Sequence, residues 1–194
     1  MYHMTGLHEA GVRHTVYIAG PDVFSLDWPA FAARVSSACE RFNLEPIFPI
    51  PPDQSLDREG VPGITIPGSI TDAENIYRQC LAQIQKADAV VANITPFRGL
   101  EPDSGTVFEI AIASAQGKMV VAYSRDRQTL ISRLMKNLRR TRYGGWLCRH
   151  GWLIERFNLP CNVMVAQACV YTLPQSDVEK ALEVLRQGFD GLFF

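Results

Sequence analysis

The chain has 194 residues, of which 47% are hydrophobic and 20% charged, and its net charge at pH 7 is -1. This length fits one domain with a substantial core, and the composition excludes a largely disordered chain. The near-neutral charge argues against a general nucleic-acid binder and against an anionic membrane surface as partner. We expect residues 1–13 to form a flexible N-terminal extension and residues 14–194 to form a single domain.

The spacing of the cysteines and the length of the apolar runs indicate the cellular compartment. No apolar run approaches the roughly 18 residues of a membrane span, and the N-terminus lacks the apolar stretch of a signal peptide. The five cysteines are scattered without a CxxC pair, and the four histidines have no metal-binding spacing. We therefore expect a cytoplasmic protein with neither a disulfide framework nor a metal site.

Short apolar runs alternate with helical patterns along the chain. Strands are predicted at 15–19, 45–49, 87–94 and 119–123, with a last strand at either 163–166 or 169–173. Helices are predicted from Trp28 after an Asp27 cap, over an apolar stripe at 69–86, from Asp103 to Gln116, and after a Ser176 cap. This alternation predicts an α/β fold, a doubly wound, flavodoxin-like parallel sheet of about five strands with helices on both faces.

In such a sheet, ligands bind beyond the carboxyl ends of the strands. Three loops are expected to converge there: Gly20–Phe24, Pro96–Asp103 and the proline-rich stretch 49–69. Tyr17 would form the floor of this site, and the helix that begins near Asp103 would form its wall. Asp88 precedes its strand at the opposite edge, so we interpret it as a structural carboxylate.

Glu109 is the only charged residue in the apolar helix that follows Asp103. A buried carboxylate is costly, so it needs a partner or a purpose. Two structural interpretations stay open: a capping box between Thr106 and Glu109, and Asp103 as a simple helix cap. The functional interpretation is glycosyl transfer, which needs two carboxylates near one pocket, with a buried Tyr17 hydroxyl seeking an acceptor.

A basic segment follows the fourth predicted strand. Residues 125–156 carry nine of the 19 lysines and arginines but only two acids. We interpret this segment as a solvated face or a subunit contact. The alternatives are a phosphate-binding lid and a nucleic-acid patch, and the neutral net charge disfavours the latter.

Four blocks spread over residues 15–172 resemble the nucleoside 2-deoxyribosyltransferases. They are Tyr17-Ile18-Ala19-Gly20-Pro21 with Phe24, the run 87–99, Asp103-x-Gly105-Thr106-x-x-Glu109, and the run 158–164. The resemblance implies a salvage enzyme that moves a 2-deoxyribosyl group between nucleobases, through a covalent intermediate on Glu109 and with retention of configuration. It also implies deoxynucleosides and free nucleobases as partners, no cofactor, and a homo-oligomer, dimer or larger, with sites shared between subunits.

The resemblance assigns roles to individual residues. Glu109 matches the nucleophile, Tyr17 the tyrosine that orients it, and Asp103 the aspartate that binds the sugar hydroxyl. In substrate binding it implicates Gly20, Phe24, Asp53, Gln54, Cys80, Asn162 and Met164. Among these, Asn162 matches an asparagine that reaches the sugar from a neighbouring subunit. Cys80 departs from the pattern, because the family often carries Asp or Asn at this position beside the base.

Two other functions stay open. One is an N-glycoside hydrolase of deoxynucleosides or deoxynucleoside monophosphates, and the other is a non-catalytic nucleotide-binding module. The turn Gly20–Phe24 lacks the serine- and glycine-rich phosphate loop that a monophosphate hydrolase would use, and Asp22 would repel a phosphate. The intact set of Glu109, Asp103 and Tyr17 argues against a pure binding module, although the fold alone does not decide.

Overall fold

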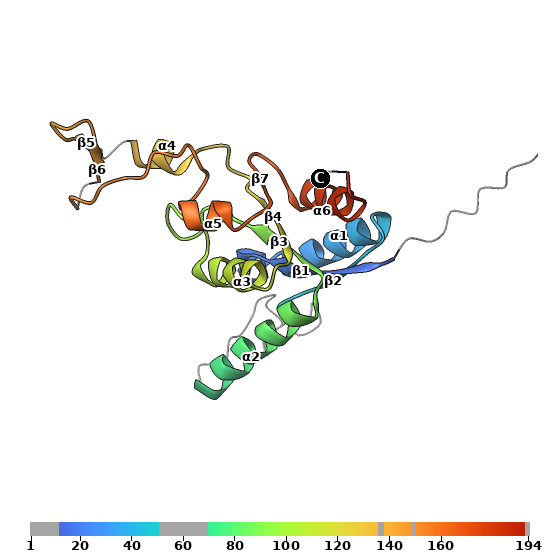
Figure 1. Ribbon diagram of the computed structural model, residues 1–194. Helices are drawn as coiled ribbons and strands as arrows, with labels where there is room; N and C mark the ends of the chain where they lie inside the picture. The colour runs from blue at the N-terminus through green and yellow to red at the C-terminus, as the bar shows by residue number, and fades with distance from the viewer. Residues whose placement is uncertain (1–11, 51–69, 136–137, 149, 193–194) are drawn as a thin grey trace, which may run out of the picture.

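Five parallel strands form the centre of the computed structural model, which describes residues 12–50, 70–135, 138–148 and 150–192. The strand order is β2-β1-β3-β4-β7 (Figure 1). The strands are β1 (His14–Ala19), β2 (Leu44–Ile47), β3 (Ala89–Asn93), β4 (Met119–Tyr123) and β7 (Tyr171–Leu173). This order, with all neighbours parallel, confirms the predicted doubly wound flavodoxin-like sheet.

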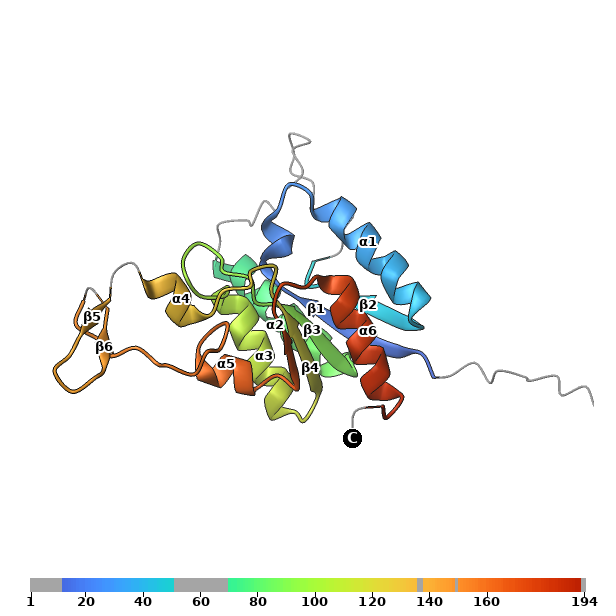
Figure 2. The same ribbon diagram turned by 90° about the horizontal axis from the view of Figure 1, so that it is seen from above.

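Helices cover both faces of the sheet (Figure 2). The helices α1 (Trp28–Arg41) and α6 (Val178–Phe189) pack on one face. The helices α2 (Ile70–Lys86), α3 (Ser104–Ala115) and α5 (Val163–Gln167) belong to the other. Because successive strand residues point to opposite faces, Val16 and Ile18 of β1 join the first layer, whereas Tyr17 joins the second. All five residues of β3 are buried, as expected for a central parallel strand.

The structure resolves two local ambiguities of the C-terminal region. The last strand is β7, within the predicted 169–173 alternative, and the other candidate segment forms the short helix α5. The expected Ser176 cap is wrong by one residue, because Asp177 Oδ1 accepts the Lys180 N–H at 3.0 Å. Asp27 occupies the position before α1, but its side chain forms no capping hydrogen bond there.

The apolar stripe of α2 is only partly a buried face. Ile84 is fully buried near the sheet, whereas Ile70 is 89% exposed and Tyr77 is 51% exposed. The helix runs away from the sheet toward its first turns (Figure 1), and the Tyr77 ring contacts Phe108 of α3 with centroids 6.2 Å apart. The amino-terminal part of α2 therefore leaves apolar side chains uncovered in the single chain.

A projecting arm, residues 138–157, leaves the body between α4 (Leu130–Leu134) and α5 (Figures 1 and 2). Within it, β5 (Arg139–Arg140) and β6 (Trp146–Leu147) pair antiparallel. The returning chain continues this pairing, because Ile154 N–H donates to the Trp146 carbonyl at 3.0 Å and Cys148 N–H donates to the Trp152 carbonyl at 2.9 Å. The arm is thus a folded element, and the sequence pattern did not predict it.

Arg133 anchors the base of the arm. Its side chain is 7% exposed and pairs with Asp126 at 3.1 Å. The guanidinium also donates to the carbonyls of Leu100 at 3.0 Å and Gln128 at 2.8 Å, and to that of Pro160. One buried cation therefore ties together the loop after β3, the loop after β4 and the chain that enters α5. No described helix is both long and apolar enough to cross a membrane.

Candidate active site

Glu109 and Tyr17 meet at the carboxyl end of the sheet. Tyr17 is fully buried on β1, and its hydroxyl donates to Glu109 Oε1 on α3 at 2.5 Å. The two residues are 92 positions apart in the chain, so tertiary structure brings them together. The capping-box interpretation of Thr106 and Glu109 is wrong, because the carboxylate is bonded to Tyr17 and another residue caps the helix.

Burial controls the electrostatics of this pair. Removal from water is the main cause that raises the pKa of Glu109 to about 7; the Tyr17 hydrogen bond opposes the rise and the nearby Asp103 charge adds to it. Burial and the adjacent Glu109 charge also raise the pKa of Tyr17, so the phenol remains a donor. Tyr17 is thus a neutral hydrogen-bond donor to Glu109. The pKa of Glu109 lies near neutral pH, a range that is common for catalytic carboxylates.

Asp103 both caps α3 and faces the pocket. Its Oδ2 accepts the Thr106 N–H at 3.0 Å and the Thr106 hydroxyl at 3.2 Å. The helix-cap interpretation of Asp103 is therefore confirmed. Because Oδ2 accepts both bonds, Oδ1 has no protein partner among the described residues and is available to a ligand.

A cavity of about 200 Å³ opens beside these two carboxylates. It is lined by Gly20, Val23, Phe24, Pro49, Ile50, Ile76, Cys80, Asp103, Gly105, Thr106 and Glu109. Four of the residues that the resemblance implicates, Gly20, Phe24, Cys80 and Asp103, thus share one cavity with Glu109. The apolar lining residues Val23, Ile50 and Ile76 were not singled out in the sequence, and the only signal for Ile76 was its place in the α2 stripe.

Cys80 lies beside the Tyr17 hydroxyl, on α2. Burial raises the pKa of this thiol, against a smaller lowering by the Tyr17 hydrogen bond. A neutral thiol is a weak hydrogen-bond donor and a weak acceptor. Cys80 therefore places a weak polar group in the cavity, at the position where the resemblance led us to expect an acid or an amide.

The short 3-10 helix η1 (Pro21–Phe24) forms the mouth of the cavity. Phe24 is 40% exposed and stacks on Phe97 with ring centroids 5.8 Å apart. The Arg98 guanidinium lies 4.6 Å from the Phe97 centroid and 5.4 Å from the Phe24 centroid. Gly20 makes this turn possible, because a Cβ at its position would lie 2.8 Å from the Asn93 Cβ. The loops after β1 and β3 therefore meet through aromatic rings and a close backbone approach.

Asn162 and Met164 lie away from this cavity in the single chain. Asn162 caps α5 by accepting the Met164 N–H at 2.9 Å, and its amide donates to Glu155 Oε1 at 3.1 Å. Met164 is 76% exposed and lines a groove between α3 and α5. A contribution of Asn162 to a neighbour's site stays a prediction. Asp53 and Gln54 lie outside the described residues.

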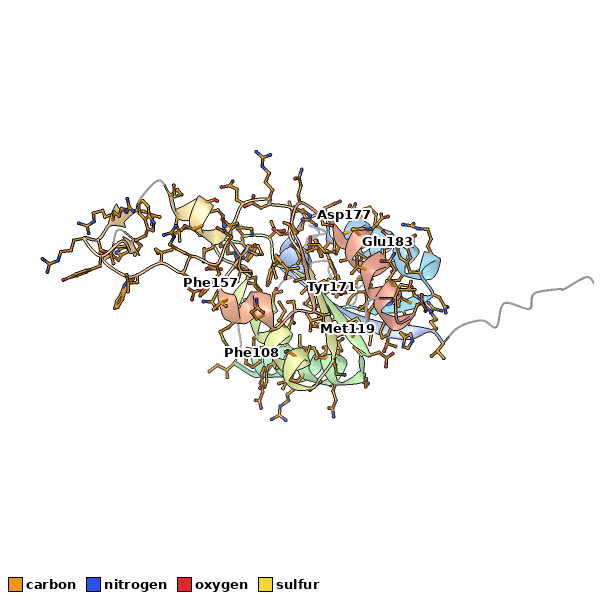
Figure 3. The ribbon with its side chains drawn as sticks, turned by 45° about the horizontal axis from the view of Figure 1, so that its top comes forward. Phe108, Met119, Phe157, Tyr171, Asp177 and Glu183 are labelled. Carbon is orange, nitrogen blue, oxygen red and sulfur yellow. The ribbon has the colours of Figure 1, made fainter. Side chains whose placement is uncertain are left out.

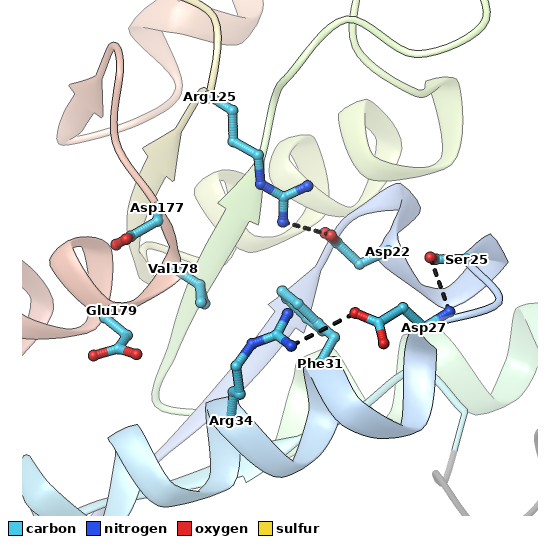
Figure 4. A pocket seen from close by; sticks show the side chains of 9 residues that line it. All are labelled: Asp22, Ser25, Asp27, Phe31, Arg34, Arg125, Asp177, Val178 and Glu179. Atoms are coloured by element: carbon cyan, nitrogen blue, oxygen red, sulfur yellow. Dashed lines mark hydrogen bonds and ion pairs between the residues drawn. The ribbon is translucent and has the colours of Figure 1, made fainter.

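A second cavity, of about 320 Å³, opens on the α1/α6 side of β1 (Figure 4). Asp22 lines it and accepts from the Arg125 guanidinium at 2.8 Å and from the Asn93 amide at 2.7 Å. Arg34 and Asp27 form another ion pair at its rim, 3.5 Å apart. The argument that Asp22 would repel a phosphate in the site is therefore corrected, because Asp22 does not line the Glu109 cavity and its charge is paired.

A buried carboxylate and its phenol partner at the carboxyl edge of a flavodoxin-like sheet define an α/β protein with a ligand site at that edge. The sequence model of the nucleoside 2-deoxyribosyltransferase family matches residues 16–164. The chain belongs to this family, and its membership makes it an enzyme of the nucleoside deoxyribosyltransferase type with nucleosides and nucleobases as the substrate class.

A solved structure from this family agrees with the assignment, and two others are similar at a lower level. A 2-deoxyribosyltransferase from Leishmania mexicana is 26% identical, with a TM-score of 0.68, and the match covers 90% of this chain and 97% of that one. A 2-deoxyribosyltransferase from Bacillus psychrosaccharolyticus is 20% identical over 57% and 72% of the two chains, with a TM-score of 0.42. A CMP N-glycosidase from Clostridium botulinum is 12% identical over 91% and 98%, also at 0.42. No curated protein sequence matches the chain.

Proposed function

We propose that this protein transfers 2-deoxyribosyl groups between nucleobases, with Glu109 as the nucleophile. The observation that carries the proposal is the 2.5 Å hydrogen bond from Tyr17 to Glu109 Oε1, inside a cavity that Asp103 also lines. The bond fixes one carboxylate oxygen and leaves the other for attack. Family membership supplies the chemical class of the reaction.

The reaction proceeds in two displacements. A Glu109 oxygen bonds to the anomeric carbon while the C–N bond breaks, and the base leaves with the bonding electron pair and takes up a proton. The oxocarbenium-like transition state is stabilised by the approaching carboxylate. A nitrogen of the second base then attacks the same carbon, loses its proton and releases Glu109. Two inversions retain the configuration, and neither step needs a metal or an organic cofactor.

The other residues have supporting roles in this proposal. The Asp103 oxygen that remains free of the helix cap accepts a sugar hydroxyl. Phe24, stacked on Phe97, provides an aromatic surface for the base. Cys80 is not assigned as the acid for the leaving base, because burial raises its pKa and keeps the thiol a poor donor. Asn162 of a neighbouring subunit completes the sugar site, and Met164 lies beside it.

Hydrolysis of a deoxynucleoside monophosphate is the second candidate function. The specific observation that favours it is at the mouth of the cavity, where Arg98 lies over Phe24 and Phe97 while Asp22 is turned to the other side of β1. Arg98 forms no ion pair with the described residues, and such a cation suits a 5′-phosphate. Water in place of a second base would then take the deoxyribosyl group from Glu109.

Purified protein incubated with deoxyinosine, with and without adenine or cytosine, tests both functions by chromatography. New deoxyadenosine or deoxycytidine supports transfer, whereas free hypoxanthine at a rate independent of the acceptor supports hydrolysis. Deoxyinosine 5′-monophosphate in parallel tests the phosphate preference. The Glu109→Ala variant is the control, and its activity within about tenfold of wild type would remove Glu109 as nucleophile. Mass spectrometry of wild type quenched without acceptor should show one added deoxyribosyl group on the Glu109 peptide.

A further inference from the structure

The cavity that Asp22 lines is larger than the Glu109 cavity, and the proposed reaction does not use it. Its volume is about 320 Å³, against about 200 Å³ beside Glu109, which is within the range of small-ligand sites. The 3-10 helix η1 separates the two cavities, because its Asp22 faces one whereas its Val23 and Phe24 line the other. Among the described residues, those that line the two cavities are entirely different, so this cavity is a separate place for a ligand.

Two arginines enter this cavity, one from α1 and one from the loop after β4, over the same aromatic ring (Figure 4). The guanidinium carbon of Arg34 lies 5.8 Å from the Phe31 ring centroid, and that of Arg125 lies 6.0 Å from it. Both side chains are about half exposed. Arg125 donates to Asp22 through one nitrogen, and Arg34 approaches Asp27 to 3.5 Å. Because a guanidinium has five N–H donors, each arginine keeps donors for a ligand.

The start of α6 forms the facing wall and supplies an acceptor. Figure 3 shows Asp177 at this end of α6, whereas the other end of the helix packs on Met119 at the start of β4. Asp177 Oδ1 accepts the Lys180 N–H, and its Oδ2 forms no hydrogen bond or ion pair with the residues that the structure describes. Glu179, which also lines this wall, is paired with Arg41 at 2.5 Å. The free acceptor on this side is therefore the second oxygen of Asp177.

A buried hydroxyl without a partner lies among the lining residues. Tyr123, the last residue of β4, is 1% exposed, and its hydroxyl forms no hydrogen bond of normal geometry within the described part of the chain. The charged groups around this hydroxyl include Asp22, Arg125 and Asp177, all of which line the cavity. A buried hydroxyl without a partner is unfavourable, and a ligand atom that completes its hydrogen bonding removes this cost. Tyr123 is thus an observation that points to a ligand, independent of the charged walls.

The mixture of charges on the walls selects the chemical class of the ligand. The lining contains four carboxylates and two guanidiniums: Asp22, Asp27, Asp177 and Glu179 against Arg34 and Arg125. An anion would approach the carboxylates and a cation would approach the guanidiniums, so a ligand of either sign meets like charges. A neutral ligand with hydroxyl groups avoids this repulsion, because a hydroxyl can donate to a carboxylate and accept from a guanidinium. Phe31 and Val178 add apolar surface for the carbon atoms of a ring.

We propose that this cavity is a second ligand site, which binds a neutral, hydroxyl-rich molecule, a nucleoside or a free sugar, between Arg34, Arg125 and Asp177. The ligand hydroxyls donate to Asp27 and to the free Asp177 oxygen, and they accept from the two guanidiniums. The Tyr123 hydroxyl bonds to a ligand oxygen at the floor. Binding here does not rest on the proposed function, because Glu109 and the residues of its cavity take no part.

Equilibrium dialysis with labelled inosine and with labelled D-ribose tests the site. Inosine is used with the Glu109→Gln protein, in which the proposed reaction cannot consume it. We expect a class of one site per chain whose Kd rises about tenfold in Arg34→Gln and in Asp177→Asn, because each variant loses a hydrogen bond to a charged group. Asparagine is also a good helix cap, so Asp177→Asn should keep α6 folded, which circular dichroism checks.

A matched control is Arg78→Gln, which removes an exposed arginine of α2 that lines neither cavity. It should bind both probes like its parent protein. Binding of both probes in the affected class would identify the sugar as the recognised part, and binding of inosine alone would identify a nucleoside. Either result supports the proposal.

The proposal would be overturned if neither probe showed a class of sites that Arg34→Gln and Asp177→Asn weaken. Tighter binding of inosine 5′-monophosphate than of inosine in this class would also overturn it, because the occupant would then be an anion. If the Glu109 cavity bound no nucleoside, the total number of inosine sites would fall while the affected class remained. Failure of this proposal is therefore distinguishable from failure of the proposed function.

Discussion

Two carboxylates stand on either side of β1 at the same edge of the sheet, and their partners differ. Asp22, on the α1/α6 side, accepts from the Arg125 guanidinium (Figure 4) and also from the Asn93 amide. Glu109, on the α2/α3 side, accepts from the Tyr17 phenol, and Asp103 is the charged residue among those described that raises its pKa. A charged donor stabilises a carboxylate more than a neutral one does. Asp22 is thus held in an ion pair, whereas burial raises the pKa of Glu109 to about 7.

The difference separates Asp22, an acid paired with a cation, from Glu109, the nucleophile that we propose. Asp22 follows β1 in the chain, and Glu109 faces β1 from α3. Both side chains are partly buried. The presence of an adjacent cation distinguishes them, because it compensates Asp22 and ties the turn after β1 to the loop after β4. The Glu109 cavity keeps its uncompensated carboxylate at a cost in folding free energy, which is typical of a functional site.

The largest expected effect comes from replacing each of these acids by its amide. Glu109→Gln should lower the transfer rate by at least about 10³-fold, because an amide is no nucleophile, whereas Asp22→Asn should change it by less than about tenfold. The rates are measured with deoxyinosine and adenine. Equal losses in the two variants would mean that the comparison between the two acids is wrong.

A second pair compares two helix caps. Asp103 caps α3 and Asp177 caps α6, each through a carboxylate that accepts a backbone N–H at 3.0 Å. Replacing either by Ala should cost about 1 kcal/mol of folding free energy, as cap removal does. Asp103→Ala should in addition raise KM and lower kcat/KM by about 10²-fold, because a hydrogen bond to a charged group is lost. Asp177→Ala with a comparable loss of activity would contradict the assignment of the sugar contact.

The Tyr17→Phe variant tests how the Tyr17 hydrogen bond affects the pKa of Glu109. Wild-type kcat/KM should fall as pH decreases below about 7, because protonated Glu109 cannot attack. The Tyr17 hydrogen bond lowers the Glu109 pKa, so its removal should move this acid limb to higher pH, with a loss of about 10- to 100-fold at pH 8. An acid limb that does not move would show that the observed pKa belongs to another group.

The smallest expected effect is on stability. The folded-state pKa of Glu109 is raised, so between pH 4.5 and about 7 the folded chain binds more protons than the unfolded chain. The contribution of Glu109 to stability is therefore present at low pH and lost as pH rises through this window. Glu109→Gln, which cannot ionise, should be more stable than wild type by roughly 1–3 kcal/mol at pH 8 and nearly equal to it at pH 4. Urea unfolding at both pH values measures this, and a difference independent of pH would refute it.

The sheet was largely predictable, because long apolar runs with both faces buried leave few alternatives. The strands at 15–19 and 119–123 lie within one residue of β1 and β4, and Glu109 stood out as one charge in an apolar helix. The short run at 163–166 was ambiguous between strand and helix, since four residues show no decisive periodicity. In the structure this segment is the helix α5, and the Asn162 side chain caps its first turn.

Other parts depended on tertiary contacts that a sequence does not display. The Asp22, Asn93 and Arg125 network joins residues from three separate strand ends. The hairpin of β5 and β6 has two-residue strands, too short for any pattern to predict. The exposed first turns of α2 carry an apolar stripe that periodicity alone assigns to a core.

The 92-residue separation of Tyr17 and Glu109 makes enzyme activity a probe of folding. In the chain, β3 comes between Tyr17 and Glu109, and in the sheet it pairs with β1. The hydrogen bond between the two residues therefore requires that these strands have already assembled. Contacts of such long sequence separation form only after the loop-closure entropy has been overcome. In refolding from urea, activity should therefore return no earlier than the assembled sheet, whereas far-UV signals from helices such as α6 recover first.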